Sequence, residues 1–362
     1  MSRAILGRKA LKGRGTLSNP PGRFERQDLE EVHDGWYEED QPDTVATTVE
    51  PDRARGIITS NDSPDIPFER SINPYRGCEH GCVYCYARPS HAYMGLSAGI
   101  DFETKLFYKA DAARVLEEEL ARPGYVCKPI TIGANTDPYQ PVEREMKVTR
   151  SILEVLARTR HPASIVTKSA LVLRDLDLLA DMARDGLMSV AVSITSLSPE
   201  TKRVLEPRTA SPQARLRALR ELNAAGVPTG VMVAPIIPAI TDHEMEAILE
   251  AAVTGGARWA GYTVVRLLYE IKDLFRDWLA EHYPDRAAHV MSLVREMRGG
   301  RDYDSTFGDR MRGTGPIAEL LRNRFKIACK RLGLNSGSRE MPQQTQLFRP
   351  PLRAGSQLSL GF

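Results

Sequence analysis

The stretch SINPYRGCEHGCVYCYARPSH, from Ser71 to His91, decides how the rest of the chain is interpreted. It places Cys78, Cys82 and Cys85 in a C-x3-C-x2-C spacing, with no fourth cysteine nearby. A closed electron-transfer cluster takes four cysteines, and a structural zinc site takes four ligands. Three thiolates can instead hold three irons of a cubane cluster and leave the fourth iron open. The spacing therefore predicts a metal cluster whose fourth iron is free to bind another molecule.

Two other interpretations of these cysteines are a zinc ribbon and three buried structural thiols. A ribbon needs a second cysteine pair, and Cys127 and Cys329 are each isolated. His80 lies inside the loop and is a candidate fourth ligand, although its place beside Gly81 suits it better to shaping the loop. The open cluster is favoured because the spacing, the tyrosines beside the last cysteine and the strand–helix pattern that follows all agree.

The composition is that of a soluble globular protein, with 42% apolar and 27% charged residues and a net charge of +2. Five cysteines in 362 residues, three of them clustered, indicate metal chemistry in a reducing compartment rather than a disulfide framework. We find neither a run long enough for a membrane span nor a signal peptide. We therefore expect a cytoplasmic protein with no membrane partner.

Strands alternate with helices of ten to fifteen residues from Ile72 onward. This pattern predicts parallel strands joined by right-handed crossovers. About six such units are visible, fewer than the eight of a closed barrel. The predicted fold class is α/β, a partial (β/α)6 TIM-type barrel with its chemistry at the carboxyl ends of the strands. Beyond Ile72 itself, the expected strands cover 129–133, 164–167, 188–194, 229–234 and 259–265, and the expected helices 111–121, 143–158, 172–185, 211–225 and 242–254.

The chain divides into four parts by composition. Residues 1–55 combine a basic block with an acidic block, which predicts a flexible, extended arm. The barrel is expected over 56–270 and a helical extension over 271–333. Residues 334–362 are rich in Ser, Gly, Pro and Gln, which predicts a disordered tail.

The cysteine spacing, with Tyr84 and Tyr86 on either side of Cys85, resembles the signature of the radical S-adenosylmethionine (SAM) superfamily. The resemblance implies a [4Fe–4S] cluster on Cys78, Cys82 and Cys85, whose open iron is chelated by the amino and carboxylate groups of SAM. An electron from the cluster would then cleave SAM into methionine and a 5′-deoxyadenosyl radical, which abstracts hydrogen from a substrate. An external reductant such as flavodoxin or ferredoxin would supply that electron.

Polar side chains follow successive strands, where this resemblance places SAM. Each one alone is as easily a helix cap or a surface loop residue. Together they lie at the ends of neighbouring strands on one rim, which favours a binding site. The candidate SAM contacts are Asn135, Thr136 and Asp137 after the second strand, Lys168 after the third and Ser193 after the fourth, with Tyr84 as a candidate contact of the adenine.

The segments TDPYQPVE (136–143), VTKS (166–169) and VSIT (192–195) resemble the spore photoproduct lyase-like branch, also called DNA-repair photolyase-like. This resemblance implies that Lys168 and Ser193 contact SAM and that the substrate is DNA or a nucleotide. Those lyases return hydrogen from a cysteine in the second loop, where this chain has Ala134. Tyr84, Tyr86 and Tyr139 are alternative hydrogen-atom relays, although a tyrosine in such a loop more often serves packing.

The chain ends in a peptide, QLSLGF, that resembles the docking peptide by which bacterial DNA-processing proteins bind the replication sliding clamp. Its anchors would be Gln357, Leu358, Leu360 and Phe362, presented to an apolar pocket by a disordered tail. A weaker copy lies at 344–348, and chance occurrence in a Gln/Leu-rich tail is the alternative.

Three functions are consistent with these features. The favoured one is a radical SAM enzyme that abstracts hydrogen from a nucleic-acid or nucleotide substrate, as in a repair reaction. The second is radical modification of a protein or a small molecule. The third is a non-catalytic iron–sulfur module associated with DNA.

Overall fold

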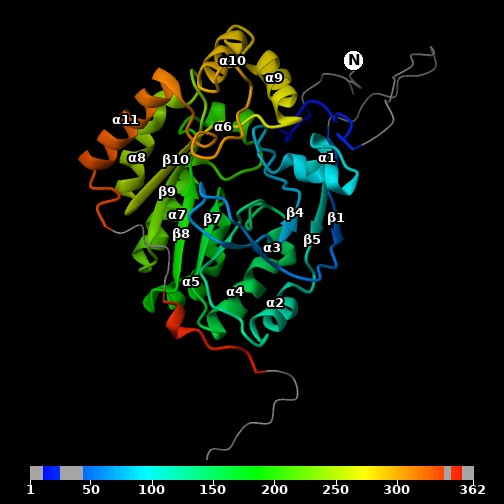
Figure 1. Ribbon diagram of the computed structural model, residues 1–362, viewed down its shortest axis with the longest axis vertical. Helices are drawn as coiled ribbons and strands as arrows, with labels where there is room; N and C mark the ends of the chain where they lie inside the picture. The colour runs from blue at the N-terminus through cyan, green and yellow to red at the C-terminus, as the bar shows by residue number, and fades with distance from the viewer. Residues whose placement is uncertain (1–10, 25–43, 338–343, 353–362) are drawn as a thin grey trace, which may run out of the picture.

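The structure is a computed structural model that describes residues 11–24, 44–337 and 344–352. Its centre is a seven-stranded sheet in the order β10-β9-β8-β7-β6-β3-β2 (Figure 1). Within this sheet the strands β3, β6, β7, β8, β9 and β10 are parallel to one another, and β2 is antiparallel to β3. Six parallel strands in an open sheet confirm the predicted partial barrel. The strands are β2 (Ile58–Ser60), β3 (Arg70–Ile72), β6 (Ile130–Ile132), β7 (Ala163–Thr167), β8 (Met188–Ser193), β9 (Thr229–Ile236) and β10 (Trp259–Val264).

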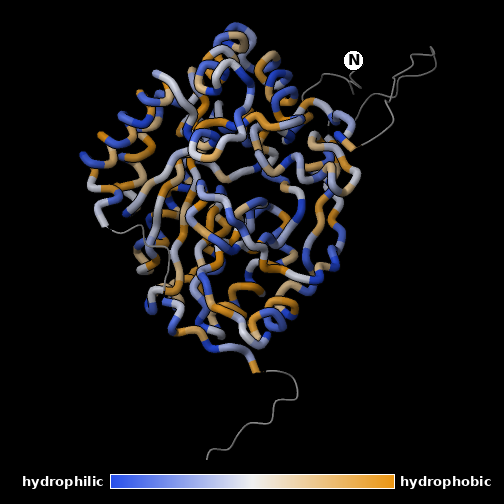
Figure 2. The backbone as a smooth tube through the Cα atoms, in the orientation of Figure 1, coloured by the Kyte–Doolittle hydropathy of each residue, from blue (hydrophilic) through white to orange (hydrophobic). Residues whose placement is uncertain are grey.

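Helices cover the outer side of this sheet, and the longer ones turn an apolar face inward. In α4, for example, Ile152, Leu153 and Leu156 are fully buried, at the three- and four-residue spacing of one helix face. Figure 2 shows the same alternation of orange and blue along the outer helices. The connecting helices are α2 (Ala112–Leu120), α3 (Glu143–Met146), α4 (Val148–Arg158), η2 (Ala170–Asp175), α5 (Leu176–Arg184), α6 (Pro199–Leu205), α7 (Pro212–Ala224), η3 (Asp242–Glu244) and α8 (Met245–Thr254).

Three more helices follow β10: α9 (Ile271–His282), α10 (Ala287–Glu296) and α11 (Gly315–Arg331). The last of them packs against α8, where Arg324 forms an ion pair with Glu246 at 2.7 Å. Two basic residues of α11 are thus engaged by α8, since Arg331 also pairs with Glu250. In the part of the chain that the structure describes, no helix is both long and apolar enough to cross a bilayer.

A second, three-stranded sheet of order β1-β5-β4 was not expected from the sequence. Strand β1 runs parallel to β5, and β4 runs antiparallel to it. Its first strand lies inside the segment that the sequence assigned to a flexible arm. The elements here are β1 (Thr48–Pro51), β4 (Tyr75–Arg76), η1 (Arg88–Met94), α1 (Ile100–Thr104) and β5 (Lys105–Tyr108).

The expectation of an extended arm over 1–55 does not hold for residues 11–24. Thr16 is fully buried, and Arg14 and Leu17 are nearly so. The physical reason is Glu103, a buried carboxylate that accepts hydrogen bonds from the backbone N–H of Gly15 at 2.9 Å and of Thr16 at 3.0 Å. This partner is distant in the sequence, so composition alone could not reveal it. Residues 1–10 and 25–43 lie outside the described residues.

The two edges of the open sheet are joined by segments that extend from them. Backbone N–H of Val264, in the edge strand β10, donates to Met311 O at 2.9 Å. The adjoining loop reaches the turn between β2 and β3, where Asp65 accepts from Gly308 N at 2.7 Å and from Arg310 Nε at 2.6 Å. The open side of the barrel is therefore spanned by a partly buried ion pair.

The tail is partly packed against the body, which differs from the expected disorder over 334–362. Phe348 lies against the rings of Tyr125 and His161, with centroid distances of 5.5 and 5.3 Å. Backbone N–H of Arg349 donates to Thr159 O at 2.8 Å. The short helix η4 (Thr345–Leu347) belongs to this segment, which contains the weaker copy of the clamp peptide. The main peptide, 357–362, lies outside the described residues.

Candidate active site

The cysteine loop follows β3 and β4, at the carboxyl end of the parallel sheet. Gly77 and Gly81 both adopt positive φ, 75° and 68°, a conformation that costs other residues free energy. A Cβ on Gly77 would also lie 2.9 Å from the His91 ring, so space as well as conformation requires glycine there. The two glycines let the chain turn tightly around the position that the three thiols share.

The three thiols lie together in a buried environment. Burial raises the pKa of Cys78, and the negative charges of Asp137 and of the other two cysteines raise it further. Burial likewise raises the pKa of Cys82, with a further contribution from Glu206. Thiolates in such surroundings require a strongly positive group beside them, which the irons of a cluster provide. The donor set therefore fits an iron–sulfur cluster.

The zinc-ribbon alternative is not supported by the arrangement of donors. Within the described ranges, no three His, Cys, Asp or Glu side chains gather around a point that suits a single metal ion. A cubane does not need such a point, because each cysteine binds a different iron. His80 is engaged elsewhere, since its Nδ1 lies 3.4 Å from Asp137 Oδ2 and it is almost fully buried.

The N-terminal segment lies directly on this loop. An ideal Cβ on Gly15 would stand only 1.7 Å from the carbonyl oxygen of Gly81. Beneath them, Glu103 pairs with Arg88 at 2.5 Å, and both side chains are fully buried. Arg88 Nε in turn donates to Cys82 O at 2.9 Å. The ion pair thus connects the N-terminal segment to the backbone of the cysteine loop.

The loop after β6 holds the predicted residues Asn135, Thr136 and Asp137 beside the cysteine loop. Thr136 is buried and its hydroxyl donates to Tyr75 O at 2.8 Å, while Asn135 N donates to Asn73 Oδ1 at 2.7 Å. Burial alone would raise the pKa of Asp137, but the charge and hydrogen bond of His80 lower it to about 2. These residues therefore fasten the two loops to each other, and their contact with SAM stays a prediction.

Asp137 also reaches the next strand end. Its Oδ2 accepts from Lys168 N at 2.7 Å, and its Oδ1 accepts from the hydroxyl of Thr167 at 2.7 Å. Lys168 projects its ammonium over the ring of Tyr84, 5.9 Å from the centroid. Among the described residues this ammonium forms no ion pair with a carboxylate. Lys168 therefore offers a positive charge close to the cysteine loop.

Tyr84 belongs to a buried network that the sequence did not reveal. Its hydroxyl donates to Glu206, and it lies 3.3 Å from the hydroxyl of Thr195. Burial would raise the pKa of Glu206, yet the positive charges of Arg215 and Lys168 lower it to about 2. Arg215 also donates to the carbonyl oxygen of Ser193 at 2.9 Å, which fixes the end of β8. The hydroxyl of Tyr84 is thus already hydrogen-bonded, and a contact of its backbone or ring with the adenine stays a prediction.

The three tyrosines considered as hydrogen-atom relays differ in their surroundings. Tyr139 is fully buried and donates to Asp175 Oδ2 at 3.1 Å. Tyr84 is also buried, whereas Tyr86 is 45% exposed and donates to the backbone oxygen of Ala134. Of the three tyrosines, Tyr86 alone is therefore exposed at the surface.

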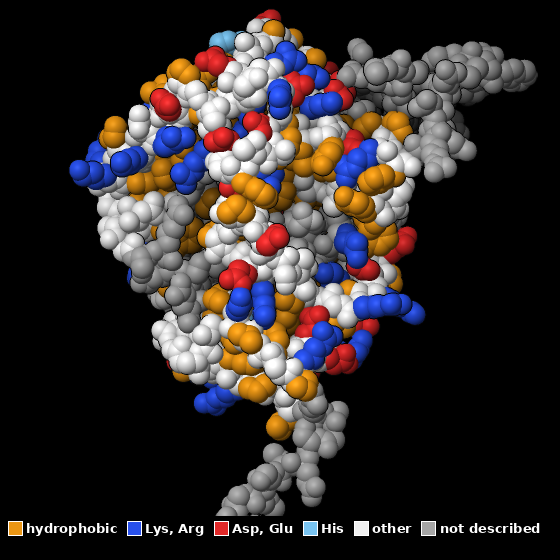
Figure 3. All heavy atoms as spheres, in the orientation of Figure 1, with side chains coloured by type: hydrophobic (Ala, Val, Ile, Leu, Met, Phe, Trp, Pro, Cys, Tyr) orange, Lys and Arg blue, Asp and Glu red, His pale blue; other side chains and the backbone are white. Residues whose placement is uncertain are grey.

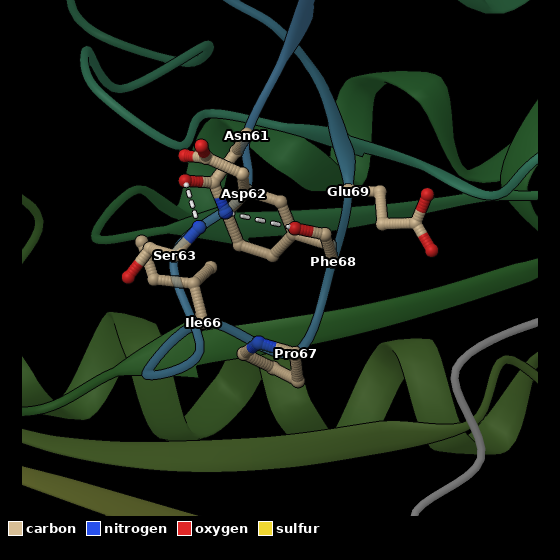
Figure 4. Close-up of a pocket in the computed structure, with 7 residues that line it drawn as sticks. All are labelled: Asn61, Asp62, Ser63, Ile66, Pro67, Phe68 and Glu69. Atoms are coloured by element: carbon tan, nitrogen blue, oxygen red, sulfur yellow. Dashed lines mark hydrogen bonds between the residues drawn. The ribbon is translucent and has the colours of Figure 1, made fainter. Parts of the chain in front are cut away.

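A hollow of about 520 Å³ lies elsewhere, at the turn between β2 and β3 (Figure 4). It is lined by residues 61–63 and 66–69 and contains none of the predicted site residues. The hydrogen bonds drawn there, from Asn61 Nδ2 to Phe68 O and from Ser63 N to Asn61 Oδ1, serve to shape the turn. We assign this hollow no part in catalysis.

Comparison with known proteins gives consistent results. The family model described as Radical SAM superfamily matches residues 72–252. An uncharacterised protein of Mycobacterium tuberculosis is 34% identical over 296 residues, covering 80% of this chain and 82% of that protein. A radical SAM Nalpha-GlyT isomerase of Pseudomonas phage M6 is 22% identical over 215 residues, covering 58% of this chain and 39% of that protein. The structure of a spore photoproduct lyase complexed with dinucleoside spore photoproduct is similar in fold, with a TM-score of 0.55, 18% identity and coverage of 79% of this chain and 80% of that chain.

Proposed function

Because the chain belongs to the radical SAM superfamily, we propose that it is an enzyme which abstracts hydrogen from a nucleic-acid or nucleotide substrate. The superfamily uses a [4Fe–4S] cluster and SAM, which confirms the cofactors predicted from the cysteine spacing. Cys78, Cys82 and Cys85 are the residues that would hold the cluster. When bound and reduced, the cluster supplies the electron that cleaves SAM and generates the hydrogen-abstracting radical.

The observation that carries the proposal is the placement of the cysteine loop at the carboxyl ends of six parallel strands, under a polar rim. This chain's own residues hold that loop in place, because Asp137 contacts His80, Glu103 pairs with Arg88 and Glu206 accepts from Tyr84. They also keep water away from the thiols, since Cys78 and Cys82 are buried. Orientation and exclusion of water are the protein's main contributions to such chemistry.

The choice of a nucleic-acid substrate is supported by likeness in fold. The spore photoproduct lyase structures that resemble this chain cover 79% of it. One of them is complexed with a dinucleoside photoproduct. Ala134 departs from the pattern of those lyases, which carry a cysteine in this loop, so we do not extend their reaction to this protein. We propose Tyr86 as the side chain that meets the substrate.

Lys168 and Ser193 are proposed to bind the carboxylate of SAM. The ammonium of Lys168 forms no close ion pair among the described side chains, although its charge acts on Glu206, and it lies beside Tyr84 in the cysteine loop. A carboxylate there would form a charge-assisted hydrogen bond in a largely dehydrated site. The hydroxyl of Ser193, at the end of the neighbouring strand β8, would provide a second donor.

Replacing Lys168 with methionine is expected to weaken SAM binding by at least about tenfold, because it removes the positive partner of a dehydrated carboxylate. Equilibrium binding of SAM to the anaerobically reconstituted protein measures this. Lys128→Met is the matched control, since Lys128 precedes the amino end of β6 and pairs with Glu69 on the surface. Equal losses of SAM affinity in the two variants would contradict the assignment of Lys168 to the SAM carboxylate.

The proposed function is tested by the formation of 5′-deoxyadenosine from SAM under reduction. The reconstituted protein is expected to form it, and single-stranded or duplex oligonucleotides are expected to accelerate its formation. Acceleration by a protein or small-molecule fraction, with none by oligonucleotides, would favour the second function. An intact cluster that yields no 5′-deoxyadenosine under any condition would favour the non-catalytic one.

Three further features complete the proposal. We propose that the enzyme acts in the cytoplasm and receives electrons from a reductant such as flavodoxin or ferredoxin. Docking on the sliding clamp through Gln357, Leu358, Leu360 and Phe362 stays a prediction of the sequence. The weaker copy is a poor candidate for clamp binding, because Phe348 packs against Tyr125 and His161.

A further inference from the structure

Two arginines meet beyond the carboxyl end of β10 with no carboxylate bound to either of them among the described residues. Arg266 follows the strand directly, and its Nη2 lies 3.2 Å from the hydroxyl of Tyr303. Arg298 follows α10 and donates through Nη2 to Val265 O at 3.1 Å, the carbonyl next to Arg266. Its Nη1 donates to Asp309 O at 2.8 Å. The two guanidinium groups are therefore held by neutral oxygens and by the sulfur of Met311.

Each of these arginines keeps an unsatisfied donor. Nε of Arg266 and Nε of Arg298 are buried without a hydrogen-bond partner in the described structure. Arg298 is only 2% exposed. Burial lowers its pKa, and the positive charge of Arg266 lowers it further, while Asp304 and Asp309 act in the opposite direction. Two nearby cations with buried, unused donors are unfavourable unless an anion joins them.

The position of Arg266 relates this pair to the reaction centre. Its guanidinium lies 5.6 Å from the ring centroid of Tyr86, the residue after Cys85. On its other side the ring of Tyr303 is 5.9 Å away, and Met311 Sδ is 3.6 Å from Nη1. The arginine thus stands between two tyrosines at the edge of the cysteine loop, and Tyr86 is partly exposed.

Arg266 and Arg298 differ from other arginines of the described surface, which carries charges of both signs. Figure 3 shows blue and red side chains interspersed over the face of the molecule in view. Arg310 pairs with Asp65, and Arg276 pairs with Asp302. A cationic site without such a partner, next to the cysteine loop, is thus a local feature and does not reflect the net charge of +2.

We propose that Arg266 and Arg298 form the binding site for a phosphate group of the substrate, with Tyr86 available to stack on the adjoining base. This rests on the proposed function and specifies its substrate as a phosphate-bearing nucleotide or polynucleotide. A guanidinium fork matches the geometry of phosphate oxygens, and two cations suit a group with up to two negative charges. Stacking on an aromatic ring is the common complement in single-stranded nucleic-acid sites.

The carboxylate of SAM is a less suitable ligand for this pair. Lys168 and Ser193 stand at the ends of β7 and β8, in the middle of the sheet, whereas Arg266 stands beyond the edge strand β10. The two cationic positions therefore serve two anionic groups on different molecules. This separation allows them to be tested independently.

The test compares binding of thymidine, thymidine 5′-monophosphate, the dinucleoside monophosphate TpT and inorganic phosphate to the full-length reconstituted holoenzyme. The two nucleotides are expected to bind at least about tenfold more tightly than thymidine, and more tightly than phosphate alone. Arg266→Gln is expected to remove the preference over thymidine, and Arg266→Lys to retain part of it, since the charge remains without the fork. Arg217→Gln, on the outer helix α7, is the control and is expected to change nothing.

Several outcomes would overturn the inference. These are equal binding of thymidine and its monophosphate, an unchanged preference in Arg266→Gln, or tightest binding of inorganic phosphate alone. Loss of SAM affinity in Arg266→Gln would also overturn it, because it would assign the arginine to the cofactor. If oligonucleotides accelerate 5′-deoxyadenosine formation without any phosphate preference, the inference fails while the proposed function stands. If the preference holds without acceleration, the proposed function fails and the phosphate site stands.

Discussion

Replacing Cys78 with alanine is expected to abolish both cluster assembly and the formation of 5′-deoxyadenosine. The variant leaves two thiols where a cubane with one open iron requires three, and no other described cysteine adjoins the loop. We expect iron and sulfide contents near background after anaerobic reconstitution, together with loss of the visible absorbance of the cluster. SAM cleavage should fall below detection, because the electron donor is missing.

The control is Cys127→Ala, which removes a thiol just before β6 and apart from the cysteine loop. Its iron content and its rate of SAM cleavage are expected to match those of the unaltered protein. Full iron content in Cys78→Ala, or equal loss in both variants, would contradict the assignment of the cysteine loop as the ligand set.

Replacing Glu103 with glutamine is expected to lower the free energy of unfolding of the apo-protein by about 3–5 kcal/mol, the cost of leaving a buried charge without its partner. The unpaired charge would be that of Arg88, which is fully buried and donates to Cys82 O. Glu103 also accepts from Gly15 and Thr16, so the N-terminal segment should loosen. Chemical denaturation measures the free energy of unfolding. The lifetime of the cluster's absorbance in air measures how far the N-terminal segment has loosened.

The matched control for this prediction is Glu118→Gln. Glu118 pairs with Arg114 on the exposed face of α2, where an ion pair contributes little. We expect a change within about 0.5 kcal/mol and an unchanged cluster lifetime. If Glu103→Gln were as stable as this control, the ion pair with Arg88 would not be what holds the cysteine loop.

The barrel and its cysteine loop could be predicted because their signals are local. Most of the parallel strands contain a short apolar run, such as Val190-Ala191-Val192, followed by a helix with a regular apolar face. The glycines beside Cys78 and Cys82 could be interpreted from spacing alone, and the structure gives both a positive φ. The strands, the helices and the turns at these glycines depend on residues that are close together in the sequence, so they can be predicted from it.

What the sequence did not reveal depends on partners that are far apart along the chain. Strand β1 forms only because Thr48 pairs with Lys105 in β5, and the buried carboxylates Glu103 and Glu206 find arginines only after folding. Nothing near Arg266 in the sequence indicates that it stands beside Tyr86. Such contacts become visible only when the strand ends are brought together on one rim.

We propose that this protein abstracts hydrogen from a nucleic-acid substrate. The most direct measurement is the mass of the 5′-deoxyadenosine formed when the reduced holoenzyme acts on an oligonucleotide whose deoxyribose and thymine positions carry deuterium. Our account predicts 5′-deoxyadenosine that contains deuterium, at a rate which Arg266→Gln lowers. Unlabelled 5′-deoxyadenosine at the same rate with and without the oligonucleotide would contradict it.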